Sequence, residues 1–289
     1  MANIRLLKNR IRTVGNISKI TKTMKMVAAS KMQKAQTQAL SSRPYAQALL
    51  ESFHTLSEYI DTSFHPLLTS HDEGVDVAVV FTTNKGLCGS LNTHLLKQLI
   101  SWNKGFPDGK VIMIGKKGVN FAKVYGLDLY AQFVDLPDKA TTSDIVVLNS
   151  LIVDNFLNKS IKSVTLIYMD FINTLIQKAK VVKLLPLNLE GQLEEEKKVE
   201  TVHKKDYVFE PNAEEILNKL LPFYIENTIY HALLEAKASE HSARMVAMKN
   251  ANENALELVD ELQLIYNKSR QESITNELLD MTSARMTIG

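Results

Sequence analysis

Two glycine-containing turns are the places where this sequence could bind phosphate. Residues 86–92 (GLCGSLN) and 115–118 (GKKG) each follow a run rich in β-branched residues. A phosphate-binding loop ends in Lys followed by Ser or Thr, and a dinucleotide-binding turn has the pattern G-x-G-x-x-G. Neither turn has either pattern, so we interpret both as structural turns and expect no nucleotide or other cofactor.

The residues that could act as nucleophiles or metal ligands show no useful pattern. Cys88 is the single cysteine, and a thiol nucleophile needs a base held beside it. His94 is nearby in the chain, but its spacing does not pair it with Cys88. The histidines lack the spacing of metal ligands; they lie at positions 54, 65, 71, 94, 203, 231 and 241. We therefore expect no catalytic residue and no metal site, and a lone cysteine excludes an internal disulfide and fits a reducing compartment.

The middle of the chain alternates between strand-like and helix-like segments. We expect strands over residues 75–83, 110–114, 127–133, 163–171 and 179–187. Helices are expected from the turn after residue 86 to about 102, over 116–125 and over 143–157. This alternation predicts a mainly parallel sheet with helical crossovers, a Rossmann-like α/β domain at residues 72–190. The charge-mixed segment that follows is expected to be a linker at residues 191–210.

The last quarter of the chain predicts one very long helix. Residues 223–288 contain no Pro and no Gly, and at about 1.5 Å per residue they would extend roughly 100 Å. A seam with alternating spacings of three and four occupies Met245, Met248, Asn252, Ala255, Val259, Leu262, Tyr266 and Ser269. This heptad favours a coiled coil over a core helix of a bundle. The C-terminal coiled-coil segment is assigned to residues 211–289.

The first 50 residues form a strongly basic segment, with ten Lys or Arg and no Asp or Glu. An apolar stripe predicts an amphipathic helix that runs past Pro44 towards Tyr59, within an N-terminal coiled-coil segment at residues 1–62. The stripe consists of Ile4, Leu7, Ile11, Val14, Ile17, Ile20, Met24 and Val27. Such helices serve as transit peptides, membrane-surface helices, nucleic-acid arms or docking elements for acidic proteins. The length and patterning argue against a transit peptide, and the mixed second half of the chain argues against nucleic acid.

The two terminal helices are expected to pair with each other in an antiparallel coiled coil. Residues 250–289 contain seven acidic and three basic residues, so this pairing would set acidic flanks against basic ones. Exposed ion pairs contribute only about 0 to 1 kcal/mol each, so apolar burial must hold the pair and charge would select its orientation. The composition, 45% hydrophobic and 23% charged, and the short aliphatic runs predict a soluble or peripheral protein without a membrane span.

Four separate segments resemble a known family. Residues 19–36 (KITKTMKMVAASKMQKAQ), 84–92 (NKGLCGSLN), 239–255 (SEHSARMVAMKNANENA) and 266–278 (YNKSRQESITNEL) closely resemble the γ subunit of F-type ATP synthases. They occur in the family's order, and the similarity extends from one end of the chain to the other. The chloroplast regulatory insert is missing, and the basic N-terminus begins directly with the family pattern. We therefore expect a mature bacterial chain.

The resemblance implies a non-catalytic rotor. In that family an antiparallel coiled coil turns inside a hexamer of α and β subunits, and an α/β domain at its foot contacts the ε subunit and the ring of c subunits. The chain would transmit torque between proton flow and the β nucleotide sites, as a peripheral protein on the cytoplasmic face of the bacterial inner membrane.

The resemblance also implies a set of contacts with the β subunit, and it carries no catalytic residue, cofactor or metal. The implied contact residues are Met24, Lys25, Arg244, Gln271 and Thr275, with Glu277 and Asp280 as secondary contacts. Residues 281–288 would form the tip in an apolar bearing. Two alternatives remain at this point: an α/β enzyme with a coiled-coil arm, and a basic nucleic-acid tether whose DNA binding would depend steeply on salt.

Overall fold

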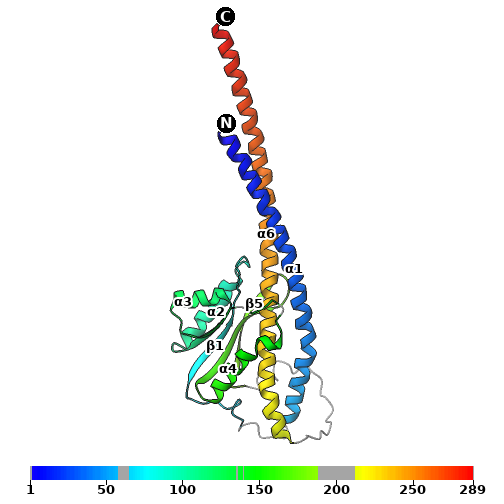
Figure 1. Ribbon diagram of the computed structural model, residues 1–289, viewed down its shortest axis with the longest axis vertical. Helices are drawn as coiled ribbons and strands as arrows, with labels where there is room; N and C mark the ends of the chain where they lie inside the picture. The colour runs from blue at the N-terminus through cyan, green and yellow to red at the C-terminus, as the bar shows by residue number, and fades with distance from the viewer. Residues whose placement is uncertain (1, 58–64, 135, 139, 188–211, 289) are drawn as a thin grey trace. The chain divides into compact units, whose positions relative to one another are not determined.

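The computed structural model describes residues 2–57, 65–134, 136–138, 140–187 and 212–288. It divides into two compact units, residues 1–29 with 244–289 and residues 30–243. The long helices α1 (Ala2–Ser57) and α6 (Ala213–Ile288) contribute to both units (Figure 1). The boundary predicted at residue 62 and the linker predicted at residues 191–210 lie outside the described residues.

The α/β unit is built on one five-stranded sheet in the order β3-β2-β1-β4-β5. The strands are β1 (Val75–Phe81), β2 (Lys110–Ile114), β3 (Leu129–Phe133), β4 (Ile161–Phe171) and β5 (Gln177–Leu185). All neighbours are parallel except β4 and β5, which form an antiparallel hairpin. The mainly parallel sheet predicted from the sequence is confirmed, and no strand end differs from its predicted position by more than two residues.

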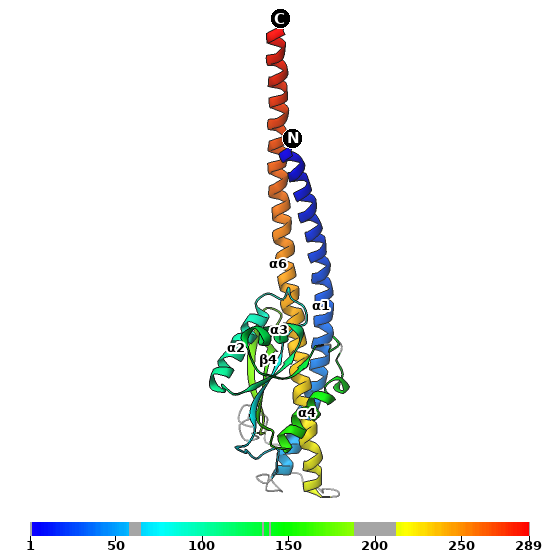
Figure 2. The same cartoon turned by 60° about the vertical axis from the view of Figure 1, so that its left-hand side comes forward.

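Helices cover both faces of this sheet (Figure 2). The helices α2 (Leu91–Gly105) and α3 (Lys116–Tyr125) pack against Ala78 and Val80 of the central strand. The helix α4 (Val146–Leu157), which follows the short 3-10 helix η2 (Thr142–Asp144), packs with α6 against Val77 and Val79 on the other face. A strand buried on both faces needs apolar residues at every position, which explains the continuous β-branched run of β1.

Helix α6 begins at Ala213, within the C-terminal segment assigned to residues 211–289 and ten residues before the stretch without Pro and Gly that begins at residue 223. The Asn212 side chain accepts a hydrogen bond from the Glu215 N–H at 2.7 Å and caps the helix, which then continues through Pro222. Leu217, Leu221 and Ile225 are all buried in the core of the sheet unit, so packing along this stretch outweighs the backbone hydrogen bond lost at the proline.

The other unit is an antiparallel pair of helices, formed by α1 up to residue 29 and α6 from residue 244. The Ser18 hydroxyl donates to Asn252 Oδ1 at 3.0 Å across the pair. Along α6 the predicted seam is confirmed: Met248, Ala255 and Leu262 are buried and the other five seam positions are half-buried, whereas most intervening residues are exposed. A shared seam of this length identifies a two-helix coiled coil.

The apolar stripe predicted along α1 divides between two faces of the helix, so the prediction of one continuous stripe is wrong. After Ile4, Leu7, Ile11 and Val14 the contact residues are Ser18, Thr21, Lys25 and Ala28, all buried or half-buried. The predicted Ile17, Ile20 and Val27 are instead 47%, 59% and 51% exposed. The 3-4 spacing of the first half continues through small or polar residues, which let α6 approach closely, and the apolar side chains fall on a neighbouring face.

Candidate functional site

An exposed apolar stripe runs along α1 beside the coiled-coil seam. It is formed by Leu6, Ile17, Ile20 and Val27, with the half-buried Met24 between the last two. We call these five residues the outward stripe. Apolar residues at helical spacing normally mark a face that packs against something, and here α6 packs against the adjacent face. The outward stripe is therefore a candidate partner surface.

This part of α1 is also strongly basic. Six of its basic side chains are exposed, namely Arg5, Lys8, Arg10, Arg12, Lys19 and Lys22. The sequence has no acidic residue before residue 51 to neutralise them locally. A basic helix with an exposed apolar stripe is complementary to a partner that offers both an apolar contact surface and acidic residues.

The structure separates two of the predicted contact residues. Met24 belongs to the outward stripe, whereas Lys25 occupies a seam position and is half-buried against α6. Lys25 lies seven residues after Ser18, and Met245 lies seven before Asn252, so antiparallel pairing places Lys25 level with Met245. The half-buried Arg244 immediately precedes Met245 in the chain. Met24, Lys25 and Arg244 therefore lie at one level of the helix pair.

The remaining predicted contact residues form a second, distant group near the C-terminus. Gln271, Thr275, Glu277 and Asp280 are all exposed on α6. Thr275 Oγ1 donates to the Gln271 carbonyl at 2.9 Å, and Ser273 Oγ donates to Glu277 Oε1 at 3.4 Å. At about 1.5 Å per residue, roughly 40 Å of helix separates this group from Arg244. The two groups can contact one partner only if it is large or present in several copies.

Beyond the start of α1, helix α6 continues without α1 alongside it (Figure 1). Four large apolar side chains are exposed on this stretch: Ile274, Leu278, Leu279 and Met281. The backbone remains helical to Ile288. This end of α6 is a further candidate contact surface, and it includes the start of the predicted tip.

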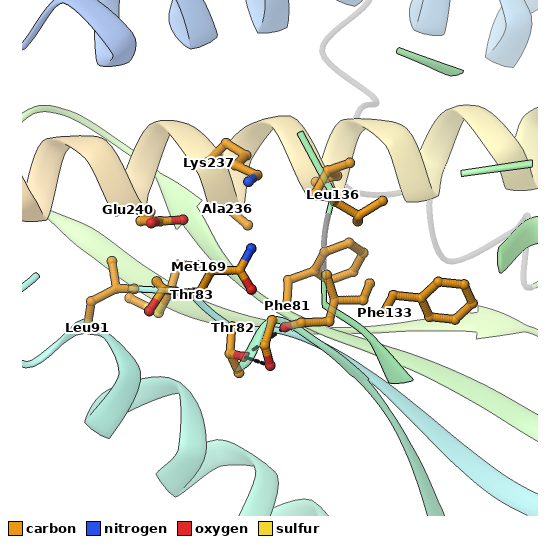
Figure 3. Close-up of a pocket in the computed structure, with 14 residues that line it drawn as sticks. Phe81, Thr82, Thr83, Leu91, Phe133, Leu136, Met169, Ala236, Lys237 and Glu240 are labelled. Atoms are coloured by element: carbon orange, nitrogen blue, oxygen red, sulfur yellow. Dashed lines mark hydrogen bonds between the residues drawn. The ribbon is translucent and has the colours of Figure 1, made fainter. Parts of the chain in front are cut away.

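The sheet unit contains one place that resembles a nucleotide site, at the carboxyl end of the strands. The strand order reverses at β1, which has β2 on one side and β4 on the other, and open α/β sheets bind ligands beside such a point. Here α6 fills the crevice: Ala236, Lys237 and Glu240 lie over the end of β1 (Figure 3). The remaining cavity of about 20 Å³ holds little more than one water molecule.

The backbone donors that could bind a phosphate at this crevice are already occupied. The N–H of Lys116, at the start of α3, donates to Asn84 Oδ1 at 3.0 Å, and that of Gly118 donates to Thr82 Oγ1 at 2.8 Å. A Cβ atom on Gly115 would lie 2.3 Å from the Thr82 carbonyl oxygen, so close backbone approach explains this glycine. These contacts support the interpretation of residues 115–118 as a structural turn.

The turn at residues 86–92 is held by Asn92. Its amide donates to Thr83 Oγ1 at 2.8 Å and to Cys88 Sγ at 3.4 Å. Cys88 is buried, whereas the side chain of His94 is exposed on α2. Among the described residues, no three His, Cys, Asp or Glu side chains are grouped to hold a metal ion. In the same part of the chain, no helix is both long enough and apolar enough to cross a bilayer.

Comparisons with known proteins identify the family. The model of the ATP synthase family matches residues 3–287. The chain is 40% identical over 285 residues to the ATP synthase gamma chain of Dehalococcoides mccartyi, covering 97% of both chains. It is also 40% identical to that of Methylacidiphilum infernorum, covering 100% of both. The chain belongs to the ATP synthase gamma chain family.

Solved structures of ATP synthases contain chains with the same fold. A chain of the Tetrahymena thermophila mitochondrial ATP synthase central stalk and c-ring structure is 27% identical, covers 80% of this chain and 99% of its own, and gives a TM-score of 0.60. A chain of the Euglena gracilis mitochondrial ATP synthase gives a TM-score of 0.70 at 21% identity, covering 99% of this chain and 95% of its own. This chain therefore shares its mixed α/β architecture with long terminal helices with chains of these assemblies.

The sequence analysis did not find the outward stripe as a separate surface, because it placed all the apolar residues of α1 in one continuous stripe. The signal was present: positions 4, 7, 11 and 14 define a phase that continues to 18, 21, 25 and 28. Following spacing instead of hydrophobicity would have left Ile17, Ile20 and Val27 on a separate face. No comparable signal marks Asp138, which lies in the connection after β3 and contacts both long helices.

Proposed function

We propose that this chain is the central-stalk rotor of an F-type ATP synthase. It transmits torque between the proton-driven membrane ring and the catalytic hexamer of α and β subunits, and so regulates ATPase activity and proton flow. It performs no catalysis itself. Its partners are the α and β subunits, the ε subunit and the c-ring, and it acts as a peripheral protein on the cytoplasmic face of the bacterial inner membrane.

The outward stripe is the observation that carries this proposal. A two-helix coiled coil needs one seam per helix, and in α1 that seam is supplied by other residues. The exposed Ile17, Ile20 and Val27 therefore require a partner outside the chain. A sleeve of subunits around the helix pair would cover them, and acidic residues on its lining would face the exposed cations of α1.

The filled crevice argues against the enzyme alternative. A nucleotide would have to displace Lys237 and Glu240 of α6 and compete with the Asn84 and Thr82 side chains for the α3 amides. The helix pair is a coiled coil, and a torque-transmitting protein needs a stiff element of this kind. We propose the four-part division into residues 1–62, 72–190, 191–210 and 211–289, with the two helical segments as shaft and the α/β domain as foot.

We propose that both predicted groups of residues contact the β subunits. Met24, Lys25 and Arg244 would form one level of contact, and Gln271, Thr275, Glu277 and Asp280 another. A subunit large enough to extend roughly 40 Å along the shaft would reach both groups on α6. Each contact should be modest in strength, because a rotor must leave it in turn.

The test is assembly with the α and β subunits from the same source. Wild-type chain should give a stoichiometric complex with ATPase activity, and Ile17→Asp should lower the yield of complex at least tenfold by placing a carboxylate in the apolar contact. Met26→Asp is the matched control, because Met26 is also apolar, is 54% exposed, and lies nine residues or two and a half turns after Ile17, on the opposite side of α1. Equal yields for the two variants would remove the stripe as the partner surface, and absence of any wild-type complex would overturn the proposed function.

A further inference from the structure

Two residues in the connection that follows β3 join the sheet unit to both long helices. One Asp138 oxygen lies 2.5 Å from Lys31 Nζ on α1, and the other lies 3.7 Å from Lys237 Nζ and 3.9 Å from His241 Nε2 on α6. A single carboxylate from the α/β fold therefore lies between cationic or protonatable groups of the two helices.

Ala140 makes a second connection of the same kind. Its carbonyl oxygen accepts hydrogen bonds from Gln38 Nε2 of α1 at 3.1 Å and from the Tyr230 hydroxyl of α6 at 3.1 Å. Gln38 Nε2 also donates to Tyr230 Oη at 2.8 Å, which closes the triangle. Ala140 is fully buried, so its carbonyl depends on these two donors.

The two connections lie at different heights along the same helix faces. Lys31 and Gln38 are seven residues apart on α1, and Tyr230 and Lys237 are seven residues apart on α6. Seven residues are two turns, or about 10 Å of helix. Two separated attachment points fix the direction of a helix as well as its position, whereas one point would act as a pivot.

Apolar packing of α1 at this place is limited. Between the two attachment points α1 presents the buried Ala35, whose methyl group covers little surface, and the half-buried Met32. Asp138 is half exposed, and ion pairs at such sites add little to the stability of a fold. By contrast, α6 is held by extensive burial of Leu221, Ile225 and Ile229. The polar contacts are thus better suited to position α1 than to stabilise the domain.

We propose that Asp138 and Ala140 form a tie through which the α/β domain turns α1 together with α6, with Asp138 as a positioning residue for torque transmission. This inference rests on the proposed rotor function. Without the tie, α6 would still follow the domain through its buried face, while α1 could lag and let the shaft slip in its contacts with the hexamer.

The tie is tested by removing it without changing its shape. Asp138→Asn removes the charge, and Gln38→Leu with Tyr230→Phe removes both donors to Ala140. The matched control is Asp128→Asn, because Asp128 pairs with Lys110 at 3.4 Å within the α/β fold and with neither helix. All variants are assembled into the complete complex in vesicles, and proton pumping and ATP hydrolysis are measured on the same preparation.

The triple variant combines Asp138→Asn, Gln38→Leu and Tyr230→Phe. We expect it to lower the ratio of protons pumped to ATP hydrolysed at least threefold, with the hydrolysis rate within twofold of wild type. Asp138→Glu, which keeps the charge, should restore most of the ratio lost in Asp138→Asn, and the control should match wild type. An unchanged ratio in the triple variant, or an equal loss in the control, would overturn the tie.

Hydrogen exchange on the full-length chain alone gives an independent measure. Amides of residues 31–38 should exchange at least tenfold faster in the triple variant, while those of β1 stay unchanged. Unchanged exchange at residues 31–38 would overturn the tie even if the variant fails to assemble. If wild-type chain does not assemble, the proposed function fails, and the exchange result still decides whether these contacts hold α1.

Discussion

Single residues on the seam and beside it should differ sharply in their effect on stability. Leu262 is 6% exposed at a seam position, and the adjacent Glu261 is exposed. Leu262→Asp places an unpaired carboxylate between the helices and should lower the free energy of unfolding of the pair by about 2 to 4 kcal/mol. Glu261→Ala should change it by less than about 0.5 kcal/mol. Thermal melting followed by circular dichroism checks this, and equal shifts would show that the assigned register is wrong.

The charge state of Asp138 gives a prediction about acid stability. Burial tends to raise the pKa of this carboxyl, but the hydrogen bond from Lys31 and the charges of Lys237, Lys31 and His241 outweigh burial and hold the pKa below its ordinary value of 3.8. A carboxyl with a lowered folded pKa stabilises the protein above the unfolded pKa, and this contribution is lost as pH falls through the folded value.

Asp138→Asn should therefore be less stable than wild type at neutral pH, and the difference should shrink as pH falls below about 3.8. Urea unfolding at a series of pH values measures it. Asp128→Asn again serves as the control. A difference that is independent of pH down to the acid transition would show that the Asp138 charge contributes nothing to stability.

At the scale of elements, one polar pair should set the register of the two helices. Ser18 donates to Asn252 within an otherwise close-packed seam. A double-mutant cycle with Ser18→Ala and Asn252→Ala should give a coupling energy of about 1 kcal/mol, the size of a partly buried neutral hydrogen bond. The same cycle with Thr23→Ala, at an exposed position whose hydroxyl bonds to its own helix, should be additive. Additivity in both cycles would remove Ser18 as a register determinant.

The contacts between α6 and the sheet also predict the behaviour of the isolated chain towards nucleotide. Helix α6 fills the crevice beside β1, and the Asn84 and Thr82 side chains already accept hydrogen bonds from the backbone N–H groups at the start of α3. The purified protein should therefore bind no ATP with a dissociation constant below about 1 mM. Isothermal titration calorimetry checks this directly. Binding in the micromolar range would show that α6 can leave the crevice.

Periodicity predicted most of these elements, and its failures have physical causes. The α6 seam was correct at all eight positions because heptad spacing and burial agree there. The apolar stripe predicted along α1 divides after Val14, because small or polar residues continue the seam and the apolar ones lie on another face. The helix at residues 213–222 contains Pro222 and depends on packing against a sheet formed elsewhere in the chain, which local propensity cannot register. The contacts of Asp138 join three elements distant in sequence, and single-sequence patterns do not encode such meetings.

At the scale of the whole molecule, the proposed contact residues should affect coupling more than assembly. Arg244 carries a planar guanidinium suited to bidentate hydrogen bonds with a stationary partner, and Gln271 and Thr275 share one side of α6. Arg244→Ala and the double variant Gln271→Ala, Thr275→Ala should assemble normally and show altered ATP hydrolysis or proton pumping by severalfold. Both activities are measured on each complex. Normal values in both variants would exclude the coupling role, and failure to assemble would make these residues structural.

The seven-residue repeat of the seam gives the helix pair a handedness. A straight α-helix has about 3.6 residues per turn, so contacts that repeat at about 3.5 make two helices wind around each other to the left. A wound pair has no mirror symmetry: twisting it in one sense tightens the winding and presses the seam residues together, and twisting it in the other sense opens them. The pair formed by α1 and α6 should therefore resist torsion unequally in the two senses. Reversing the rotation also exchanges the driving and the loaded end of the shaft, so synthesis and hydrolysis would twist the pair in the same sense and load it with the same stiffness.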